Sequence, residues 1–359
     1  MFRTAVTMTA SNKPVQSGYT IIEMMVAITL GLLITAGLTT IFVSNSQTRN
    51  EIERASEQTE NGLYAMRLLT EDLRNAGYLA EFNPALLGAP AALPDPCATA
   101  TADLKAALPI AVQGYDNPAA APSCLSDVRA GTDIVVVRRA STCAIGDAGC
   151  DTLVAGAPYF QASTCSSAAE LSSGNVSFYY GLEVDTTKLT LHQKDCNPPV
   201  PGTLAPLHQY RTHIYFIANN DKSGDGIPTL KRAELGASGF TIVPLVEGIE
   251  NLQIEYGIET VSPPTGTAGV FTTNPGGYGG CTGSTCVGYW RNTVAAKVYL
   301  LARNKATSAG YTGGNNKTYA MGLNADGTAN TAGPFNDTYR RHAYNSVVRL
   351  NNTAGRNTP

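Results

Sequence analysis

The chain has 359 residues, of which 43% are hydrophobic and 15% charged. That length and composition allow one large domain or two ordinary ones with a sizeable core, and they exclude a disordered chain. The formal net charge is −3 and the basic residues are scattered, so nucleic-acid binding is not expected.

The N-terminal segment begins with a polar leader and continues into an uncharged run. The leader carries Arg3 and Lys13 and ends in Gly18, and residues 24–43 contain no charge. At about 1.5 Å per residue this run spans roughly 30 Å as a helix, the thickness of a hydrocarbon core. A secretory signal peptide has a cleavage site after its apolar part, and none follows Val43. We therefore expect a membrane anchor that stays on the chain.

An amphipathic pattern follows the apolar run without a break. No proline occurs between Pro14 and Pro84, so nothing forces a helix to stop at the membrane surface. The expected buried face consists of Ile52, Ala55, Thr59, Leu63, Met66, Leu69, Leu73 and Ala76, and the charged residues between them are Glu51, Glu53, Glu57, Glu60, Arg67, Glu71 and Asp72. We expect residues 19–79 to form one helix of roughly 90 Å whose second half docks on a soluble domain. An anchor followed by a free juxtamembrane helix would show the same periodicity.

Gly18 and the following "YTIIE" resemble the prepilin peptidase site of type IV pilins and type II secretion pseudopilins. The resemblance implies cleavage between Gly18 and Tyr19 and methylation of the new amino terminus at Tyr19. It also implies that Glu23 is an assembly contact, because its carboxylate can pair with the amine of a neighbouring subunit. Tyr19 replaces the more common Phe, and Thr40 stands where many major pilins have a proline.

The rest of the chain is predicted to be a β-rich domain. A Pro- and Ala-rich linker begins near residue 80, and strand-like runs follow at 132–139, 175–184, 188–193, 210–218, 250–258, 292–303 and 340–350. In the run 250–258, Leu252, Ile254 and Tyr256 alternate with Gln253 and Glu255, which predicts a half-buried strand. We expect an α+β fold in which an antiparallel sheet receives the amphipathic half of the long helix.

Five blocks along the chain resemble successive segments of PilW-type minor pilins. They are "AGTDIVVVRR", "YFIANNDKSGDGIPTLKR", "LVEGIENLQIEYGI", "WRNTVAAKVYLLAR" and "YRRHAYNSVVRLNN". The domain division that the resemblance implies is a cleaved leader at 1–18, a long helix at 19–79 with its transmembrane part at about 24–43, and a periplasmic or extracellular domain at 80–359.

Eight cysteines lie beyond residue 90, and none forms a CxxC pair. The four histidines lie outside any zinc-ligand spacing, so disulfides in an oxidising compartment explain the cysteines better than a metal cluster, with buried free thiols as the alternative. Neighbour spacing favours pairing Cys143 with Cys150 and Cys281 with Cys286, although the full connectivity stays open.

The stretch 219–226 has the front half of a calcium loop. Asn219, Asp221, Ser223 and Asp225 stand at two-residue spacing, but position 12 of the loop is Arg232 rather than a bidentate Glu. A polar turn between strands explains the same residues without Ca²⁺, and no other cofactor is expected.

Two further segments have a functional and a plain interpretation. The glycine-rich loop 274–290 carries Tyr278, Tyr289 and Trp290, which could contact a neighbouring subunit or a ligand; a flexible loop followed by a strand with Trp290 in the core is the simpler interpretation. The C-terminal arginines 340, 341, 349 and 356 form no continuous basic stripe on a strand, so a solvated strand edge is favoured over DNA binding.

No catalytic pattern is present: there is no GxSxG elbow, phosphate loop or HExxH, and His192, His208 and His213 are most simply surface or cross-strand polar residues. We therefore expect no enzyme. The favoured hypothesis is a minor pilin that serves initiation and assembly of a type IV pilus, the fimbrium linked to cell motility. Its expected partners are major and minor pilins, the prepilin peptidase, the inner-membrane assembly machinery and inner-membrane lipid. The alternatives are a minor pseudopilin of type II secretion and a tip adhesin or DNA-uptake pilin.

Overall fold

The computed structural model describes residues 18–165, 179–196, 202–308, 310–312, 314 and 316–356. The chain divides between Glu53 and Arg54 into two compact units. The unit that begins at Arg54 is called the head below, and each unit is described by itself.

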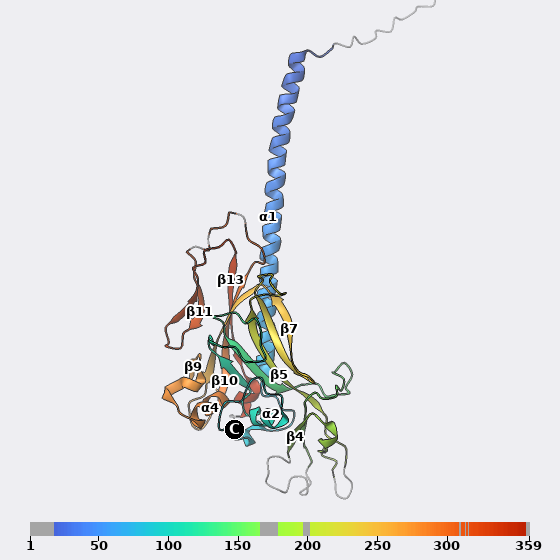
Figure 1. The fold of residues 1–359 in the computed structure, drawn as a ribbon, viewed down its shortest axis with the longest axis vertical. Coiled ribbons are helices and arrows are strands. Elements are labelled where there is room, and N and C mark those ends of the chain that lie inside the picture. The colour runs from blue at the N-terminus through green and yellow to red at the C-terminus, as the bar shows by residue number, and fades with distance from the viewer. Residues whose placement is uncertain are drawn as a thin grey trace, which may run out of the picture. The chain divides into compact units, whose positions relative to one another are not determined.

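The helices are α1 (Ile21–Asn75), α2 (Thr101–Ala107), α4 (Ser284–Arg291) and α5 (Asn351–Arg356), with 3₁₀ turns η1 (Pro84–Leu86), η3 (Thr186–Lys188) and η4 (Pro275–Gly280). The strands are β1 (Val112–Tyr115), β2 (Ile134–Ala140), β3 (Tyr159–Ala162), β4 (Tyr180–Glu183), β5 (His208–Ala218), β6 (Thr229–Gly236), β7 (Gly239–Glu247), β8 (Ile249–Ile258), β9 (Val270–Thr272), β10 (Thr293–Arg303), β11 (Tyr319–Leu323), β12 (Ala329–Ala332) and β13 (Arg341–Arg349). Figure 1 shows these elements in the colours of the chain order.

The strands of the head form three sheets. A seven-stranded sheet has the order β1-β2-β5-β3-β4, with β6 paired to β5 and β7 to β6. A four-stranded sheet has the order β13-β10-β8-β9, and β11 pairs with β12. Every strand pair in the described residues is antiparallel. The long helix and the antiparallel sheets confirm the α+β class, although the single sheet expected from the sequence is divided into several.

The last turns of α1 build the main core. Leu69 and Leu73 are fully buried and pack with residues of both large sheets, among them Val135 of β2 and Leu252 of β8. Burying a leucine side chain contributes about 1.5–3 kcal/mol to the free energy of unfolding, so the last turns of α1 help to stabilise the head. The helix ends four residues earlier than predicted, because Gly77 adopts a left-handed φ of 73° and its N–H donates to the carbonyl of Arg138.

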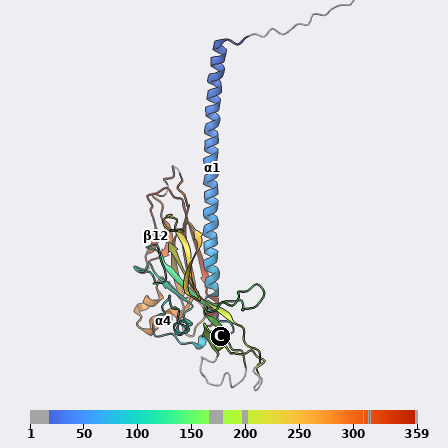
Figure 2. The same ribbon diagram turned by 45° about the vertical axis from the view of Figure 1, so that its right-hand side comes forward.

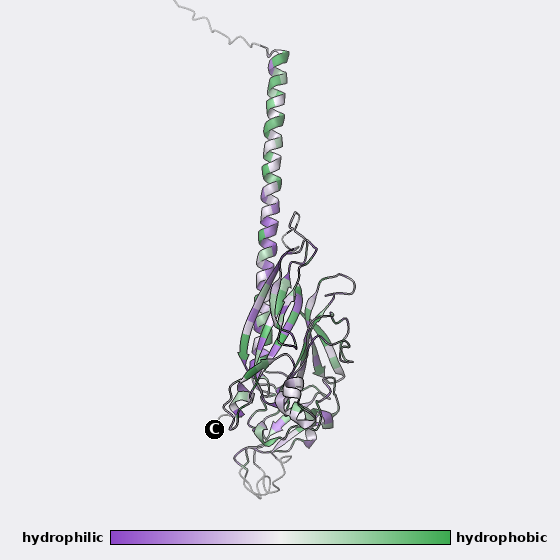
Figure 3. Cartoon of the chain, turned by 90° about the vertical axis from the view of Figure 1, so that its left-hand side faces the viewer, coloured by the Kyte–Doolittle hydropathy of each residue, from purple (hydrophilic) through white to green (hydrophobic). Residues whose placement is uncertain are grey.

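The buried face of α1 differs in part from the predicted one. Met66, Leu69, Leu73 and Ala76 are buried, but Ile52, Ala55, Thr59 and Leu63 are exposed. Asp72, which the charge pattern places on the polar face, is only 5% exposed. The helix therefore turns a different and partly polar face towards the sheets in its earlier turns. Figure 3 shows the change along α1 from a mostly hydrophobic N-terminal part to a mixed later part.

The prediction that β8 is half-buried is wrong. Gln253 and Glu255 are 4% and 2% exposed, so both faces of the strand are covered. Glu255 accepts hydrogen bonds from Tyr299 Oη and from the N–H of Leu323 in β11, and Gln253 bonds Asn330 in β12. The β11–β12 hairpin thus covers the face on which the polar residues stand.

Predicted strand boundaries hold to within about two residues for β2, β5, β8, β10 and β13. The predicted strand at 188–193 is wrong: η3 occupies its start, and among the described residues the segment forms an isolated bridge, from His192 to Leu204, and no strand. The run 175–184 falls partly outside the described residues, and β4 accounts for its end.

Candidate assembly segment and its docking on the head

The expected cleavage site lies in a non-helical segment directly before α1. Gly18, Tyr19 and Thr20 have no helical structure, and the Tyr19 side chain is 91% exposed. A peptidase would not have to unwind a helix to reach the bond between Gly18 and Tyr19. This accessibility is the geometric observation that bears on the cleavage hypothesis.

Glu23 has a local role that the sequence analysis missed. The N–H and the Oγ1 hydroxyl of Thr20 both donate to Glu23 Oε2 at 3.0 Å, and the N–H of Glu23 donates to Thr20 Oγ1 at 3.3 Å. This reciprocal arrangement is a capping box, which satisfies free N–H groups at the start of a helix. The signal was present in the sequence, because "TIIE" fits the S/T-x-x-E pattern.

The apolar run of α1 is suited to a lipid environment. Among the described residues, α1 is the helix long and apolar enough to cross a membrane, and none of its apolar part is buried. The hydroxyls of Thr29, Thr35, Thr39 and Thr40 donate to the carbonyls four residues earlier, at 2.5–2.8 Å. Each hydroxyl is thus satisfied within the helix, as hydrocarbon requires.

Polar contacts bind the part of α1 that follows Arg54 to the strands of the head. Gln58 Nε2 donates to the carbonyls of Ala302 and Arg340 at 2.9 and 2.8 Å. Lys305 Nζ lies 2.5 Å from Glu57 and 2.9 Å from Glu247 of β7. These contacts fix the register of the helix against the strands before the apolar turns begin.

Deeper in the head, Asp72 joins α1 to the seven-stranded sheet. Its Oδ1 accepts from Arg139 Nε at 2.6 Å, and its Oδ2 accepts from His213 Nδ1 at 2.7 Å and Tyr215 Oη at 2.8 Å. The first partner comes from β2 and the other two from β5. One carboxylate therefore ties the helix to two strands.

Burial and charge set the protonation of this cluster. Burial opposes ionisation of Asp72, but hydrogen bonds and charges from His213 and Arg139 outweigh it and hold the pKa of Asp72 well below its usual range. Burial lowers the pKa of His213, and Arg232 and Arg139 lower it further while Asp72 raises it. His213 is only 4% exposed, so the surface interpretation is wrong for this histidine, and likewise for His208 at 5%.

The close approach of helix and sheet depends on a glycine. At Gly62 of α1, a Cβ atom would overlap the ring of Tyr344 in β13. The four-stranded sheet can therefore contact α1 at this point only while the residue has no side chain.

The calcium candidate folds as a turn between β5 and β6. Both carboxylate oxygens of Asp225 accept backbone N–H groups, from Asp221 and Ile227 on Oδ1 and from Lys222 on Oδ2. These bonds lower the pKa of Asp225, and Ile227 contributes most. Within the described residues no group of three or more His, Cys, Asp or Glu side chains could hold a metal ion. Backbone N–H groups thus occupy the carboxylate of Asp225 in a polar turn, and the candidate residues Asn219, Asp221 and Ser223 belong to the same segment.

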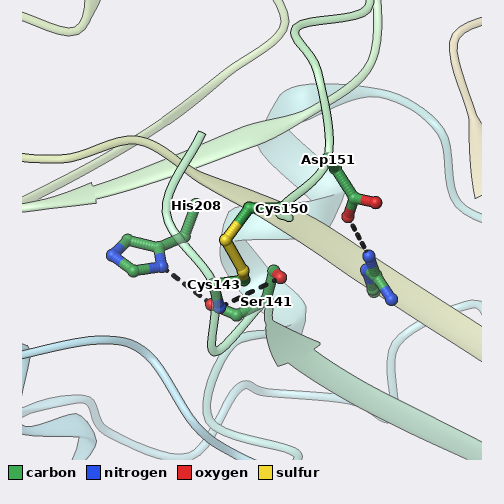
Figure 4. The surroundings of a disulfide bond; sticks show 6 residues. Ser141, Cys143, Cys150, Asp151 and His208 are labelled. Carbon is green, nitrogen blue, oxygen red and sulfur yellow. Dashed lines mark hydrogen bonds and ion pairs between the residues drawn. A yellow bond between two sulfur atoms is a disulfide. The ribbon is translucent and has the colours of Figure 1, made fainter. Parts of the chain in front are cut away.

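All eight cysteines are paired, as Cys97–Cys124, Cys143–Cys150, Cys165–Cys196 and Cys281–Cys286. Two of these pairs are those that the neighbour spacing favoured. Around Cys143–Cys150, His208 Nδ1 lies 2.7 Å from the carbonyl of Ser141, and Asp151 pairs with Arg211 (Figure 4). Disulfide and polar bonds together stabilise a loop that has little apolar core of its own.

The glycine-rich loop follows the simpler interpretation at Trp290, whose side chain lies in the core. Trp290 is 2% exposed and packs edge-on against Tyr256 at a centroid distance of 4.8 Å, but it lies in α4 rather than at a strand start. Tyr278 and Tyr289 stack edge-on with each other at 5.2 Å and stay partly exposed.

The expectation of a solvated strand edge is wrong for Arg341, which is 5% exposed. Its guanidinium pairs with Glu250 at 2.5 Å and with Asp337 at 2.6 Å. A buried, neutralised arginine is unable to bind a phosphate backbone, so the C-terminal arginines offer no continuous DNA-binding surface in the described residues.

Two family models match parts of the chain. The family model "Type IV Pilus-assembly protein W" matches residues 214–352, from β5 to α5, and the "Prokaryotic N-terminal methylation motif" matches residues 13–39. The first match contains four of the five blocks quoted above, and the block at 130–139 lies outside it. No curated protein matches the chain. Among solved structures, a type IV-like pilin from Thermus thermophilus aligns over 83% of this chain and 96% of its own, with 12% identity and a TM-score of 0.33.

The methylation motif, the apolar helix and the antiparallel head define a type IV pilin-like protein with a membrane-anchoring helix. Within that class, residues 214–352 of the chain match the PilW family model. Pilins are structural proteins, and the family assignment agrees with the expectation that the chain is not an enzyme.

Proposed function

We propose that the chain is a minor pilin that takes part in initiation and assembly of a type IV pilus. The observation that carries the proposal is helix α1 itself. Its first half is apolar and unburied, its last turns form the head core, and the processing motif stands at its exposed start. Such a helix suits a subunit that waits in a membrane and then packs beside the helices of other subunits.

The proposed organisation follows the sequence prediction. Residues 1–18 are the leader, which prepilin peptidase removes between Gly18 and Tyr19, and Tyr19 then carries the methylated amine. Residues 19–79 contain the helix with its membrane part at about 24–43, and residues 80–359 complete the head. The disulfides support a head on the periplasmic side of the inner membrane and later on the cell surface.

Glu23 has two roles in this proposal. Before assembly its carboxylate caps α1 through Thr20. In the fibre it pairs with the Tyr19 amine of a neighbouring subunit, because an unpaired carboxylate in an apolar environment costs about 2.5–3.5 kcal/mol. Pairing across subunits would set their axial register.

The proposed partners are other pilins, the prepilin peptidase, the assembly machinery and membrane lipid. A minor pseudopilin of type II secretion shares the N-terminal motif, but the match to a pilus-assembly family favours a pilus. The DNA-uptake alternative loses support because Arg341 is buried in ion pairs.

Deletion and complementation test the proposal. Loss of the chain should abolish surface pili and leave exoprotein secretion intact, whereas the reverse result would favour the secretion system. N-terminal sequencing of the chain recovered from membranes should begin at Tyr19. An intact Met1, or a start after Val43, would refute the proposed processing.

A further inference from the structure

Two arginines meet where α4 and α5 end. Arg291 is the last residue of α4, and Arg356 is the last residue of α5. Arg356 Nη2 donates to the carbonyl of Arg291 at 2.9 Å, and Arg291 Nη2 donates to the carbonyl of Ala85 in η1 at 3.1 Å. Backbone carbonyls therefore position both guanidiniums.

This corner of the head is anchored to the end of α1. Asn352 Nδ2 donates to the carbonyls of Asn75 and Ala76 at 3.3 and 3.2 Å, which holds α5 against the helix terminus. Figure 2 shows α4 and β12 of the head from a second direction. The two arginines are thus held among α4, α5, η1 and the end of α1.

No carboxylate balances this pair among the described residues: neither Arg291 nor Arg356 forms an ion pair within 4.0 Å, unlike Arg139, Arg303 and Arg341. Burial lowers the pKa of Arg291. Burial, and then the positive charge of Arg291, lower the pKa of Arg356 to about 10. Two like charges share a partly buried position, which is costly unless an anion joins them.

The helix termini offer only part of the compensation. A helix C-terminus carries a partial charge of roughly −0.5 and favours a cation, so two such ends still leave about one positive charge. Each guanidinium has five N–H donors, and the contacts above use one from each. Arg291 Nε is buried and has no hydrogen-bond partner.

We propose that Arg291 and Arg356 form a binding site for an oxyanion, namely a carboxylate or phosphate group. The planar guanidinium matches two oxygens of such a group, and a pair of them matches its charge. The site needs no part of the N-terminal segment, so it stands or falls independently of the proposed role in pilus assembly.

Thermal unfolding of the full chain in detergent tests the site, with chloride, phosphate and acetate compared at equal ionic strength. Phosphate or acetate should raise the midpoint by about 2 °C or more over chloride. Arg356→Gln and Arg291→Gln should each lose this increment. Arg49→Gln removes an exposed arginine from the unit that ends at Glu53 and should keep the increment.

The pattern of increments decides the outcome. An increment with acetate identifies a carboxylate ligand, and one with phosphate alone identifies a phosphate group; both support the site. In chloride, Arg356→Gln should unfold at or above the wild-type midpoint, because it removes one of two like charges. Equal increments in all variants would reflect general salt effects and overturn the proposal, as would no increment with either anion.

Discussion

Replacing Asp72 by Asn should destabilise the head by about 3–5 kcal/mol, the range measured when one partner of a buried ion pair is removed. The carboxylate is 5% exposed and accepts three hydrogen bonds of 2.6–2.8 Å, from Arg139, His213 and Tyr215. Asn preserves the shape and leaves no cavity, but it removes the charge that balances Arg139, whose side chain is 12% exposed. Whole domains are stable by only about 5–15 kcal/mol, so the loss is a large share.

Urea unfolding of the detergent-solubilised chain measures this loss. Trp290 is the one tryptophan and lies buried against Tyr256, so its fluorescence reports on the head core. Glu71→Gln is the matched control. Glu71 is the neighbour of Asp72 in α1, is exposed and pairs with Arg67 at 3.4 Å, so its replacement should lower the free energy of unfolding by no more than about 0.5 kcal/mol. The difference between wild type and Asp72→Asn should shrink as the pH falls below about 4, since the Asp72 contribution is present above its unfolded pKa and is lost below it. Equal stability of the two variants at neutral pH would refute the assigned role of Asp72.

Three further predictions concern packing and protonation. Gly62→Ala should lower the free energy of unfolding by about 1–3 kcal/mol, because the new Cβ atom forces Tyr344 aside. Gly88→Ala, whose Cβ atom would meet nothing within 4 Å, should leave it unchanged. Equal urea midpoints for the two variants would contradict the close approach of α1 and Tyr344. Because burial lowers the pKa of His213, the unfolded chain takes up a proton first, and wild-type stability should fall as the pH drops from about 7 to 5. His213→Gln should flatten this dependence of stability on pH. An unchanged dependence in the variant would contradict the assigned role of His213. Burial raises the pKa of Asp133 to about 7, although the N–H groups of Ile254 and Asn117 oppose the shift. The unfolded chain therefore loses the Asp133 proton first, and the free energy of unfolding should fall as the pH rises from about 4 to 7. Asp133→Asn should remove this loss in the same titration, and a slope like that of the wild type would argue against the assignment.

Periodicity predicted the elements whose pattern is local. The apolar run, the helix that continues beyond it, and strands β5, β8, β10 and β13 follow from residue spacing alone, and the structure agrees within a few residues. The helix end at Asn75 was missed because a Gly in a helical pattern is tolerated, and only the left-handed φ of Gly77 shows that it stops α1 here.

Long-range partners explain the remaining errors. The charge pattern of α1 predicts that Asp72 is exposed, because its partners Arg139 and His213 lie 67 and 141 residues away in the sequence. Gln253 and Glu255 alternate with apolar residues as in a half-exposed strand, but the β11–β12 hairpin covers them. Neither fact can be predicted from spacing, since each depends on which segments the fold brings together.

Glu23 shows the reverse case, in which a local signal was overlooked beside a family motif. The capping box in "TIIE" means that Glu23→Ala would remove both the helix cap and the proposed intersubunit charge. Capping contributes about 0.5–2 kcal/mol, and a Gln at the same position also caps. Glu23→Gln therefore separates the two roles.

Surface piliation of cells that carry Glu23→Gln separates the proposed charge contact between subunits from the helix cap. Glu23→Gln should still be cleaved before Tyr19 yet support as few pili as Glu23→Ala. Thr20→Ala, which weakens only the cap, should keep most of the pili. Normal piliation with Glu23→Gln would contradict the account, because it would leave Glu23 as a helix cap and remove the charge contact between subunits.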